Sequence, residues 1–377
     1  MSVMPISAKE INDHIVEMKE LFILDVRNED DFNDWKIEGS TITHLHVPYY
    51  TLLEDVSQIL DKLPKEQQIT VVCAKEGSAK YVAEMLGEKG FHVVYLEGGM
   101  KSWSEYIYQT RVYQDENMKI YQLIRVGKGC LSYMIISGGQ AIVIEPLRFI
   151  DLYVDLAEKE GVKITHIFDS HLHADHISGG YELAQKCDAK FYLMKSEGAI
   201  FDFEHLEDYE KIDVENIRIE VLSVKTPGHT PGSVSFLVND TILFSGDTIF
   251  VNGLGRPDLG GKVREWAKDL YNTVYEKIAQ IADDVIVLPA HYADFSKEIN
   301  EEGYIGSMLG NIRLQNEIMQ GQTEAEFVEH VAKSAATTTP PNFENILAVN
   351  KGILKATVDE ISEFEIGPNR CAVHHAG

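Results

Sequence analysis

The chain is poor in cysteine and in basic side chains, and it has no long apolar run. Its four cysteines, Cys73, Cys130, Cys187 and Cys371, form no CxxC pair, which argues against a disulfide framework and against a structural zinc ribbon. Only 34 lysines and arginines stand against 60 aspartates and glutamates, a net charge of −26. We therefore expect no nucleic acid partner, because phosphates need Lys and Arg. No apolar run approaches the roughly 18 residues that span a bilayer, so no membrane association is expected either.

The start of the sequence, MSVMPISAKEINDH, has no basic segment followed by an apolar stretch, which is the pattern of a secretory leader. This start and the unpaired cysteines together predict a cytoplasmic protein. A length of 377 residues exceeds what one ordinary core supports, so two domains are expected. The sequence leaves a homo-oligomer open.

The first part of the chain alternates helical and strand-like segments. Helical patterns over 7–18, 51–62 and 78–89 alternate with the apolar runs LFILDV, ITVVC and HVVYL. Continuous apolar strands between helices are typical of a parallel sheet with helices on both faces. We therefore predict an α/β domain over residues 1–112. Its end lies in a segment around 105–119 that keeps neither periodicity.

The second part, predicted over residues 116–377, holds more strands than a single sheet packs comfortably. It opens with CLSYMIIS and QAIVIEP, which read as a hairpin turned at Gly138-Gly139. Further strands are expected at 164–169, 190–194, 217–224, 234–238, 241–245 and VIVLPA. Helices are expected at 150–160, 177–187 and 262–281, and the pattern is helical again from 301 onward.

The stretch SHLHADHISGG, residues 170–180, crowds three histidines and an aspartate directly after an apolar strand. Ligand-type residues also follow three later strands, in TPGHTPG, SGDT and VIVLPAH. Strand ends in α/β folds meet at one rim, so residues distant in sequence come together there. The pattern predicts a metal site. Its candidate ligands are His171, His173, Asp175, His176, His229, Asp247 and His291.

The motifs HLHADH, TPGHT, SGDT and PAH, in this order, resemble those of the metallo-β-lactamase fold. The resemblance covers residues 116 to 377 and implies an αββα sandwich with its site at one edge. This superfamily includes hydrolases, nucleases and oxygenases, so the fold alone does not name the reaction.

Two chemistries are compatible with these ligands. A two-zinc thioester hydrolase similar to glyoxalase II would use both halves of the ligand set, with a bridging carboxylate. An oxygenase would instead hold one mononuclear Fe(II) with His171, His229 and Asp247 and leave positions open for O2 and a sulfur anion. In that case His173, Asp175, His176 and His291 would orient ligands and water from behind, or would hold a second metal.

Two further stretches favour the oxygenase. Arg256-Pro257-Asp258 within SGDTIFVNGLGRPDLGG, and the later PPNFENILAVN, resemble persulfide dioxygenases of the ETHE type. The resemblance implies a small thiol persulfide and O2 as substrates, sulfite or thiosulfate as product, and Arg256 as a substrate contact. A surface ion pair is the alternative role for Arg256.

Cys73 ends the run ITVVC just before the helix expected at 78–89. Loop amides and a helix N-terminus stabilise a thiolate at such a place. LFILDVRNEDDF, VVCAKEGSAKYVAEML and VYLEGGMKSW resemble a rhodanese domain, which implies that Cys73 is a sulfur-carrying nucleophile. The loop departs from that family at Glu76, where glycine is usual, and at Ser78, where arginine is usual; Lys75 is the candidate replacement for the missing positive charge.

Together these patterns predict a rhodanese and persulfide dioxygenase fusion with sulfurtransferase chemistry at Cys73. A two-zinc hydrolase with a sulfur-carrier domain, and a non-catalytic sulfur-relay or sensing protein, stay open as alternatives. Cys130 and Cys187, in apolar strand and helix contexts, are expected in the core.

Overall fold

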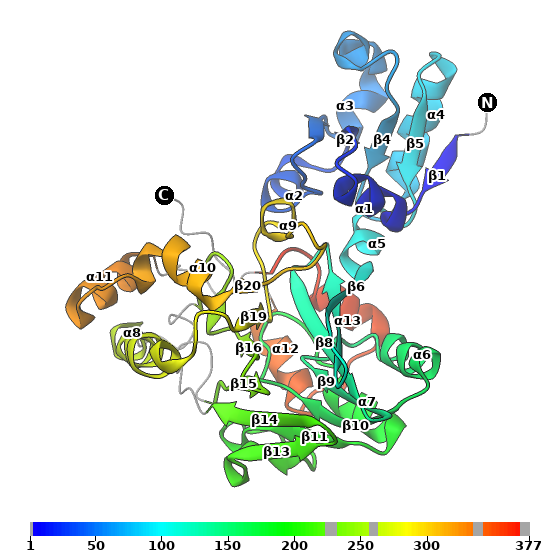
Figure 1. The fold of residues 1–377 in the computed structure, drawn as a ribbon. Helices are drawn as coiled ribbons and strands as arrows, with labels where there is room; N and C mark the ends of the chain where they lie inside the picture. The colour runs from blue at the N-terminus through cyan, green and yellow to red at the C-terminus, as the bar shows by residue number, and fades with distance from the viewer. Residues whose placement is uncertain (1–2, 223–231, 256–262, 335–341, 370–377) are drawn as a thin grey trace.

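The computed structural model describes residues 3–222, 232–255, 263–334 and 342–369. A smaller body, drawn in blue and cyan in Figure 1, holds the first part of the chain, and a larger body holds the rest. Trp103 of the smaller body and Val126 of the larger one belong to the same apolar cluster, so the two cores are continuous. Among the described residues, no helix combines the length and the apolar character needed to cross a bilayer.

The smaller body is a five-stranded parallel sheet with the order β1-β5-β4-β2-β3. Its strands are β1 (Met4–Ile6), β2 (Leu21–Asp25), β3 (Ile42–His46), β4 (Ile69–Val72) and β5 (Val93–Leu96). Successive residues of β2 face opposite sides, because side chains alternate along a strand. Leu21 and Ile23 pack in one core and Phe22 and Leu24 in the other.

Helices cover both faces of this sheet. One core receives side chains from α1 (Ala8–Val16) and α5 (Gly99–Glu105), and the other from α3 (Tyr49–Glu54) and α4 (Gly77–Glu88). The predicted α/β domain with a parallel sheet is therefore confirmed.

Some elements of this domain left no clear sequence pattern. The edge strand β3 has no fully buried residue, and α2 (Glu29–Asp34) buries no side chain, so neither shows apolar periodicity. The helix expected over 51–62 is divided at Asp55, whose carboxylate accepts the N–H of Ser57 and starts a 3₁₀ helix (Val56–Lys62).

The larger body is a sandwich of two sheets. The seven-stranded sheet has the order β12-β11-β10-β9-β8-β7-β6, and the six-stranded sheet has the order β13-β14-β15-β16-β19-β20. The first contains β6 (Ile107–Gln114), β7 (Lys119–Arg125), β8 (Cys130–Ser137), β9 (Gln140–Ile144), β10 (Lys163–Phe168), β11 (Lys190–Leu193) and β12 (Glu204–His205). The second contains β13 (Lys211–Val214), β14 (Ile217–Leu222), β15 (Ser235–Val238), β16 (Ile242–Gly246), β19 (Ile286–Pro289) and β20 (Ser307–Met308).

The inner faces of the two sheets pack on each other, and helices cover the outer faces. Phe168 and Phe236, one from each sheet, meet edge to face with ring centroids 5.4 Å apart. The outer core of the first sheet includes α6 (Asp151–Glu160) and α7 (Gly180–Cys187). That of the second includes α8 (Val263–Asn272), α10 (Leu309–Gln315) and α11 (Glu324–Ser334). The predicted αββα sandwich is confirmed.

The segment around 105–119 forms an element after all, because most of it is strand β6. A register shift between Arg111 and Tyr113 interrupts its pairing with β7, and such a bulge breaks the alternation by which a strand is found in a sequence. The domain ranges 1–112 and 116–377 stay a prediction.

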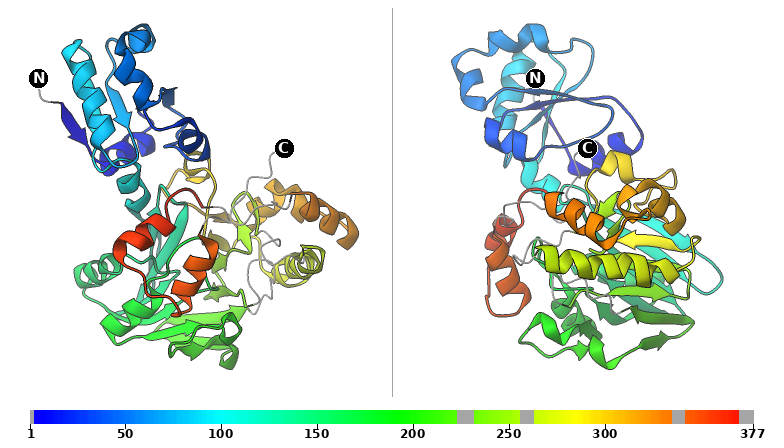
Figure 2. Two further views of the ribbon diagram at one scale, coloured as in Figure 1. Left: turned by 180° about the vertical axis from the view of Figure 1, so that it is seen from behind. Right: turned by 90° about the vertical axis from the view of Figure 1, so that its left-hand side faces the viewer.

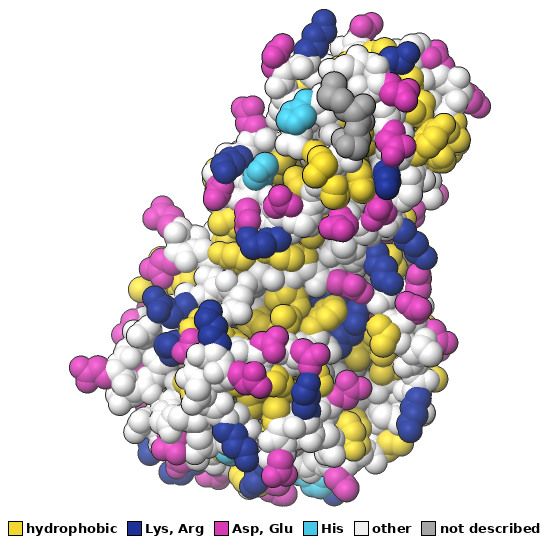
Figure 3. All heavy atoms as spheres, turned by 90° about the vertical axis from the view of Figure 1, so that its right-hand side faces the viewer, with side chains coloured by type: hydrophobic (Ala, Val, Ile, Leu, Met, Phe, Trp, Pro, Cys, Tyr) yellow, Lys and Arg dark blue, Asp and Glu magenta, His cyan; other side chains and the backbone are white. Residues whose placement is uncertain are grey.

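Two helices near the end of the chain, α12 (Phe343–Asn350) and α13 (Val358–Phe364), pack next to each other against the larger body, as Figure 2 shows. On the face drawn in Figure 3, acidic and basic side chains are interspersed over both bodies. On that face neither sign of charge forms a continuous patch.

Candidate metal centre and cysteine loop

The predicted ligands lie where strands of both sheets end. His171 follows β10, Asp247 follows β16, and His291 follows β19. Because β16 and β19 are parallel neighbours, their carboxyl ends bring Asp247 and His291 together. Gly246 has φ +54°, and a side chain there would meet the hydroxyl of Ser170 at 2.6 Å. A glycine before Asp247 therefore lets the two sheets approach at the cluster.

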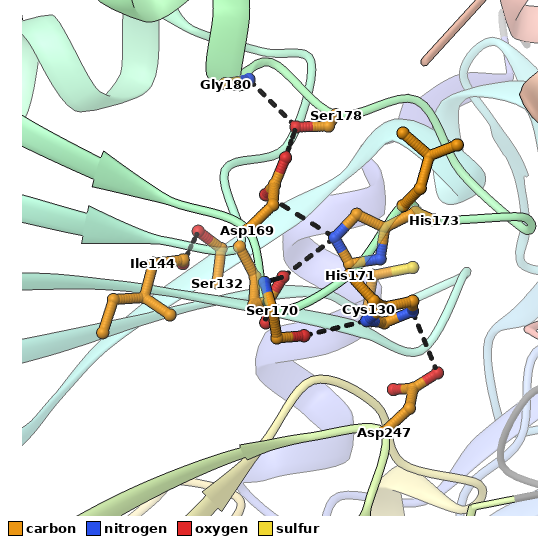
Figure 4. Close-up of polar contacts among 12 residues, drawn as sticks. Cys130, Ser132, Ile144, Asp169, Ser170, His171, His173, Ser178, Gly180 and Asp247 are labelled. Carbon is orange, nitrogen blue, oxygen red and sulfur yellow. Dashed lines mark hydrogen bonds and ion pairs between the residues drawn. The ribbon is translucent and has the colours of Figure 1, made fainter. Parts of the chain in front are cut away.

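One half of the cluster surrounds His171 and His173 (Figure 4). Nε2 of His171 lies 3.6 Å from Oδ2 of Asp247, and Nδ1 of the same ring is joined to Oγ of Ser170 by a hydrogen bond of 2.8 Å. Nε2 of His173 lies 2.8 Å from Oε2 of Glu145. Each ring is thus oriented by a polar partner on one nitrogen, as is usual for metal-binding histidines.

The other half is centred on Asp175. Its Oδ1 lies 3.0 Å from Nδ1 of His176 and its Oδ2 lies 3.0 Å from Nε2 of His291. Nδ1 of His291 is in turn 2.6 Å from Oδ1 of Asp247, which connects the two halves. The fourth member of this half is Cys130, whose Sγ lies 3.7 Å from Oδ2 of Asp175.

The donor atoms fit a cation. All six predicted ligands within the described residues are at most 4% exposed. Nδ1 of His173 and Nε2 of His176 make no hydrogen bond among those residues, and each such buried polar atom costs about 1–3 kcal/mol if nothing binds it. The donors form two sets, and within each set the donor atoms lie within 4.8 Å of one another: Glu145, His171 and His173 in one, and Cys130, Asp175, His176 and His291 in the other. This set of nitrogen, oxygen and sulfur donors suits a transition metal or zinc.

The carboxylates also favour positive charge at the cluster. Burial lowers the pKa of His173, but the neighbouring carboxylates of Asp169 and Glu145 raise it well above its usual value. Burial likewise lowers the pKa of His291, but nearby carboxylates, Asp247 first, raise it well above its usual value. The negative electrostatic potential of these carboxylates would stabilise a bound cation in the same way.

Two residues that no sequence pattern singled out hold the loop that carries His173 and His176, which we call the ligand loop. The amide nitrogen of Asn350, at the end of α12, donates to the carbonyls of His173 and His176, both at 2.8 Å. The carboxylate of Glu365, just after α13, accepts the N–H of Ile177 at 2.6 Å. Both contacts join segments about 170 residues or more apart, which no local pattern reveals.

Cys130 is fully buried, as its apolar neighbours along β8 indicated. The sequence did not show that its sulfur lies beside Asp175 in the metal cluster. Cys187, expected in the core as well, ends α7 and is half-buried. His229 and Arg256, the other predicted site residues of this domain, lie outside the described residues.

The loop after β4 holds Cys73 as the sequence indicated. Its Sγ accepts the backbone N–H groups of Glu76 at 3.2 Å and Ala79 at 3.3 Å, and the residue is 5% exposed. Lys75 is exposed and its Nζ lies 3.4 Å from a carboxylate oxygen of Glu363 on α13. The role of Lys75 at a sulfur anion stays a prediction.

These features define a class: a metal-binding αββα sandwich preceded by an α/β domain with a cysteine loop. Residues 125–292 match the metallo-beta-lactamase superfamily, and residues 7–106 match the rhodanese-like domain. The chain belongs to the metallo-beta-lactamase superfamily and carries an N-terminal rhodanese-like domain.

Several proteins resemble the sandwich domain. The mitochondrial persulfide dioxygenase ETHE1 of Homo sapiens is 33% identical over 43% of this chain, and the match spans 63% of the human protein. The probable metallo-hydrolase YqgX of Bacillus subtilis is 30% identical over 42% of this chain, and the match spans 83% of that protein. The sandwich domain is thus related to persulfide dioxygenase, although the chain spans less than two thirds of that relative.

Solved structures agree on the fold. A metallo-beta-lactamase from Staphylococcus aureus has a TM-score of 0.53 and 30% identity, and the match covers 67% of this chain and 74% of that one. ETHE1 from Myxococcus xanthus has a TM-score of 0.52 and 22% identity, covering 62% of this chain and 98% of that one.

Proposed function

We propose that the chain oxidises a low-molecular-weight thiol persulfide, and that Cys73 of its rhodanese-like domain moves sulfane sulfur. The persulfide, O2 and water would give the free thiol, sulfite and protons. The observation that carries the proposal is that one chain joins two parts. One is a buried histidine and carboxylate cluster on a domain related to persulfide dioxygenase. The other is a loop that directs backbone N–H groups at a cysteine sulfur.

In this proposal His171, Asp247 and the sequence-assigned His229 hold a mononuclear Fe(II). When bound, the iron would supply redox chemistry and open positions for a sulfur anion and O2, as two-histidine, one-carboxylate sites do. The chain's own groups keep the ligands in place. The hydrogen bond between Ser170 and His171 fixes one ring, and the 2.6 Å contact from His291 orients the carboxylate of Asp247.

The Cys73 thiolate would first attack the outer sulfur of a second substrate persulfide, whose S–S bond would break to release the free thiol and leave a Cys73 persulfide. Sulfite would attack the outer sulfur of a Cys73 persulfide, the S–S bond to Cys73 would break, and thiosulfate and the Cys73 thiolate would leave. The N–H groups of Glu76 and Ala79 face the sulfur and stabilise its negative charge at each stage. Because both sites belong to one chain, sulfite stays at a raised local concentration.

The test compares persulfide-dependent O2 uptake in the wild type, His171→Ala and His166→Ala. His166 lies on β10 outside the cluster and serves as the matched control. We expect His171→Ala to lose uptake and bound iron, and His166→Ala to keep both. Full uptake in His171→Ala would contradict the proposal.

A two-zinc thioester hydrolase is the second candidate. It is favoured by the second donor group around Asp175, His176 and His291 and by the metallo-hydrolase relative. Anaerobic thioester cleavage by the zinc-loaded chain, without any O2 uptake by the iron-loaded chain, would support this candidate instead.

A further inference from the structure

We propose that Cys130 is a metal ligand, and that with Asp175, His176 and His291 it forms a thiolate-containing Zn²⁺ site next to the iron position. These donor atoms differ from the ligands assigned to the iron. The inference therefore does not depend on persulfide oxidation.

The backbone holds Cys130 against the loop that carries His291. The N–H of Leu131 donates to the carbonyl of Ala290 at 2.8 Å, and Cys130 and His291 form an antiparallel bridge. The preceding Gly129 has φ +80°, and a side chain there would meet the carbonyl of Tyr292 at 2.9 Å. The pair Gly129-Cys130 therefore allows the two chain segments to approach while only the thiol enters the cluster.

The distances match those between ligands of one tetrahedral ion. Zn–S of about 2.3 Å and Zn–N or Zn–O of about 2.0–2.2 Å separate a sulfur from an oxygen ligand by about 3.6 Å, and a nitrogen from an oxygen ligand by about 3.4 Å. Here Sγ of Cys130 lies 3.7 Å from Oδ2 of Asp175, and Nε2 of His291 lies 3.0 Å from the same oxygen. All four donor atoms lie within 4.8 Å of one another, so one ion reaches them after small side-chain shifts.

The polar surroundings of its sulfur distinguish Cys130 from a structural thiol. Cys130, Asp175, His176 and His291 are 0–2% exposed. Nε2 of His176 makes no hydrogen bond within the described part of the chain. A structural cysteine packs among apolar side chains, whereas the sulfur of Cys130 faces a carboxylate and lies in the cluster of rings seen in Figure 4.

The chemistry of the donors selects the class of ion. A thiolate, two imidazoles and a carboxylate are ligands that Zn²⁺ accepts in tetrahedral geometry. The ligands assigned to the iron include no sulfur, so the two positions differ in softness. We therefore expect different metals to sort between them.

Cobalt tests the assignment, because Co²⁺ bound by a thiolate shows a near-ultraviolet charge-transfer band that nitrogen and oxygen ligands do not give. The chain is stripped with a chelator and titrated with Co²⁺ as wild type, C130S, C130A and C187S. Cys187 lies outside the cluster and is the matched control. We expect the band in the wild type and in C187S and not in either Cys130 variant. The Zn²⁺ affinity of C130S and C130A should fall by more than about tenfold relative to the wild type, and that of C187S should not change.

A variant with C73S, C187S and C371S keeps only Cys130 and decides the question even if the Cys130 variants do not fold. The band is expected to persist in it. Loss of the band there, or a band that remains in C130A, would overturn the assignment. An intact band in a chain without persulfide oxidation would contradict the proposed function alone.

Discussion

Glu76 has a backbone conformation that glycine adopts without strain and other residues rarely adopt. Its φ is +132° and its ψ is −49°, and such strain costs on the order of 1–3 kcal/mol. The surrounding contacts hold it there. Its carboxylate accepts the N–H of Gly98 at 3.0 Å, and its own N–H points at the sulfur of Cys73. The glutamate that replaces the usual glycine thus fastens the cysteine loop to the start of α5.

Replacement of Glu76 separates the strain from the hydrogen bond. Glu76→Gly and Glu76→Ala both lose the carboxylate, but only alanine must keep the strained backbone. We expect the glycine variant to be more stable than the alanine variant by about 1–3 kcal/mol, measured by urea unfolding. Equal stabilities would mean that the loop is not held in this conformation.

Asn350 joins the end of α12 to the ligand loop through hydrogen bonds from its side-chain amide. Besides its two donated bonds, its amide oxygen accepts the N–H of Ser178 at 3.0 Å. Asn350→Asp keeps the shape but places charge against two carbonyls. We expect metal affinity to fall by about 10–100-fold, measured by competition with a chelator. Asn345→Asp, an exposed position on the same helix, should change nothing; an equal loss in both variants would rule out the specific contact.

Helix α13 connects the two bodies through Glu365. Its carboxylate pairs with Arg125 at 3.0 Å and with Arg148 at 2.7 Å. Arg125 donates to the carbonyl of Ser104, and Arg148 pairs with Glu105, both at the end of α5. Because Glu365 also binds the N–H that follows the ligand loop, one buried carboxylate links the rhodanese-like domain to the metal centre.

Glu365→Gln leaves the buried Arg125 without a charge partner and leaves Arg148 paired with Glu105 alone. We expect a loss of about 3–5 kcal/mol near neutral pH. Glu363→Gln, in an exposed pair two residues earlier in α13, should cost less than about 1 kcal/mol. Burial raises the pKa of Glu365, but the two arginines outweigh this and lower it below its ordinary 4.5. Its stabilisation is therefore present above about pH 4.5 and disappears as the pH falls through the folded pKa.

Unfolding of the wild type and Glu365→Gln across this pH range checks the sign. The difference between them should shrink in acid. A difference that grows as the pH falls would contradict the assigned charge state of Glu365.

At the scale of the whole molecule, the Cys73 loop faces α13 of the other body. Lys75 pairs with Glu363, and Lys101 of α5 lies 3.6 Å from Asp359. We expect Cys73→Ser to keep persulfide-dependent O2 uptake and to release sulfite without thiosulfate. The reason is that the metal centre oxidises the persulfide, whereas Cys73 transfers the sulfur that turns sulfite into thiosulfate. Quantification of both anions measures this. Thiosulfate formed by the variant at the wild-type rate would exclude Cys73 from the transfer.

Much of this architecture could be predicted because it depends on local patterns. Apolar runs marked the strands, and ligand-type residues at their ends placed His171, Asp247 and His291 at one rim. Cys130 could not be placed, since its neighbours in β8 are those of any buried strand. Asn350 and Glu365 act on backbone groups far away in the sequence, so only the fold reveals them. The cytoplasmic location stays a prediction.

The central claim is that the metal centre oxidises sulfur, and the most direct measurement is the ratio of O2 consumed to sulfite and thiosulfate formed. The chain is purified without oxygen, loaded with iron and supplied with a thiol persulfide. We predict that the O2 consumed equals the sum of the sulfite and thiosulfate formed, and that the zinc-loaded chain gives neither O2 uptake nor these products. Persulfide left unoxidised by the iron-loaded chain, while the zinc-loaded chain cleaves thioesters, would contradict the account.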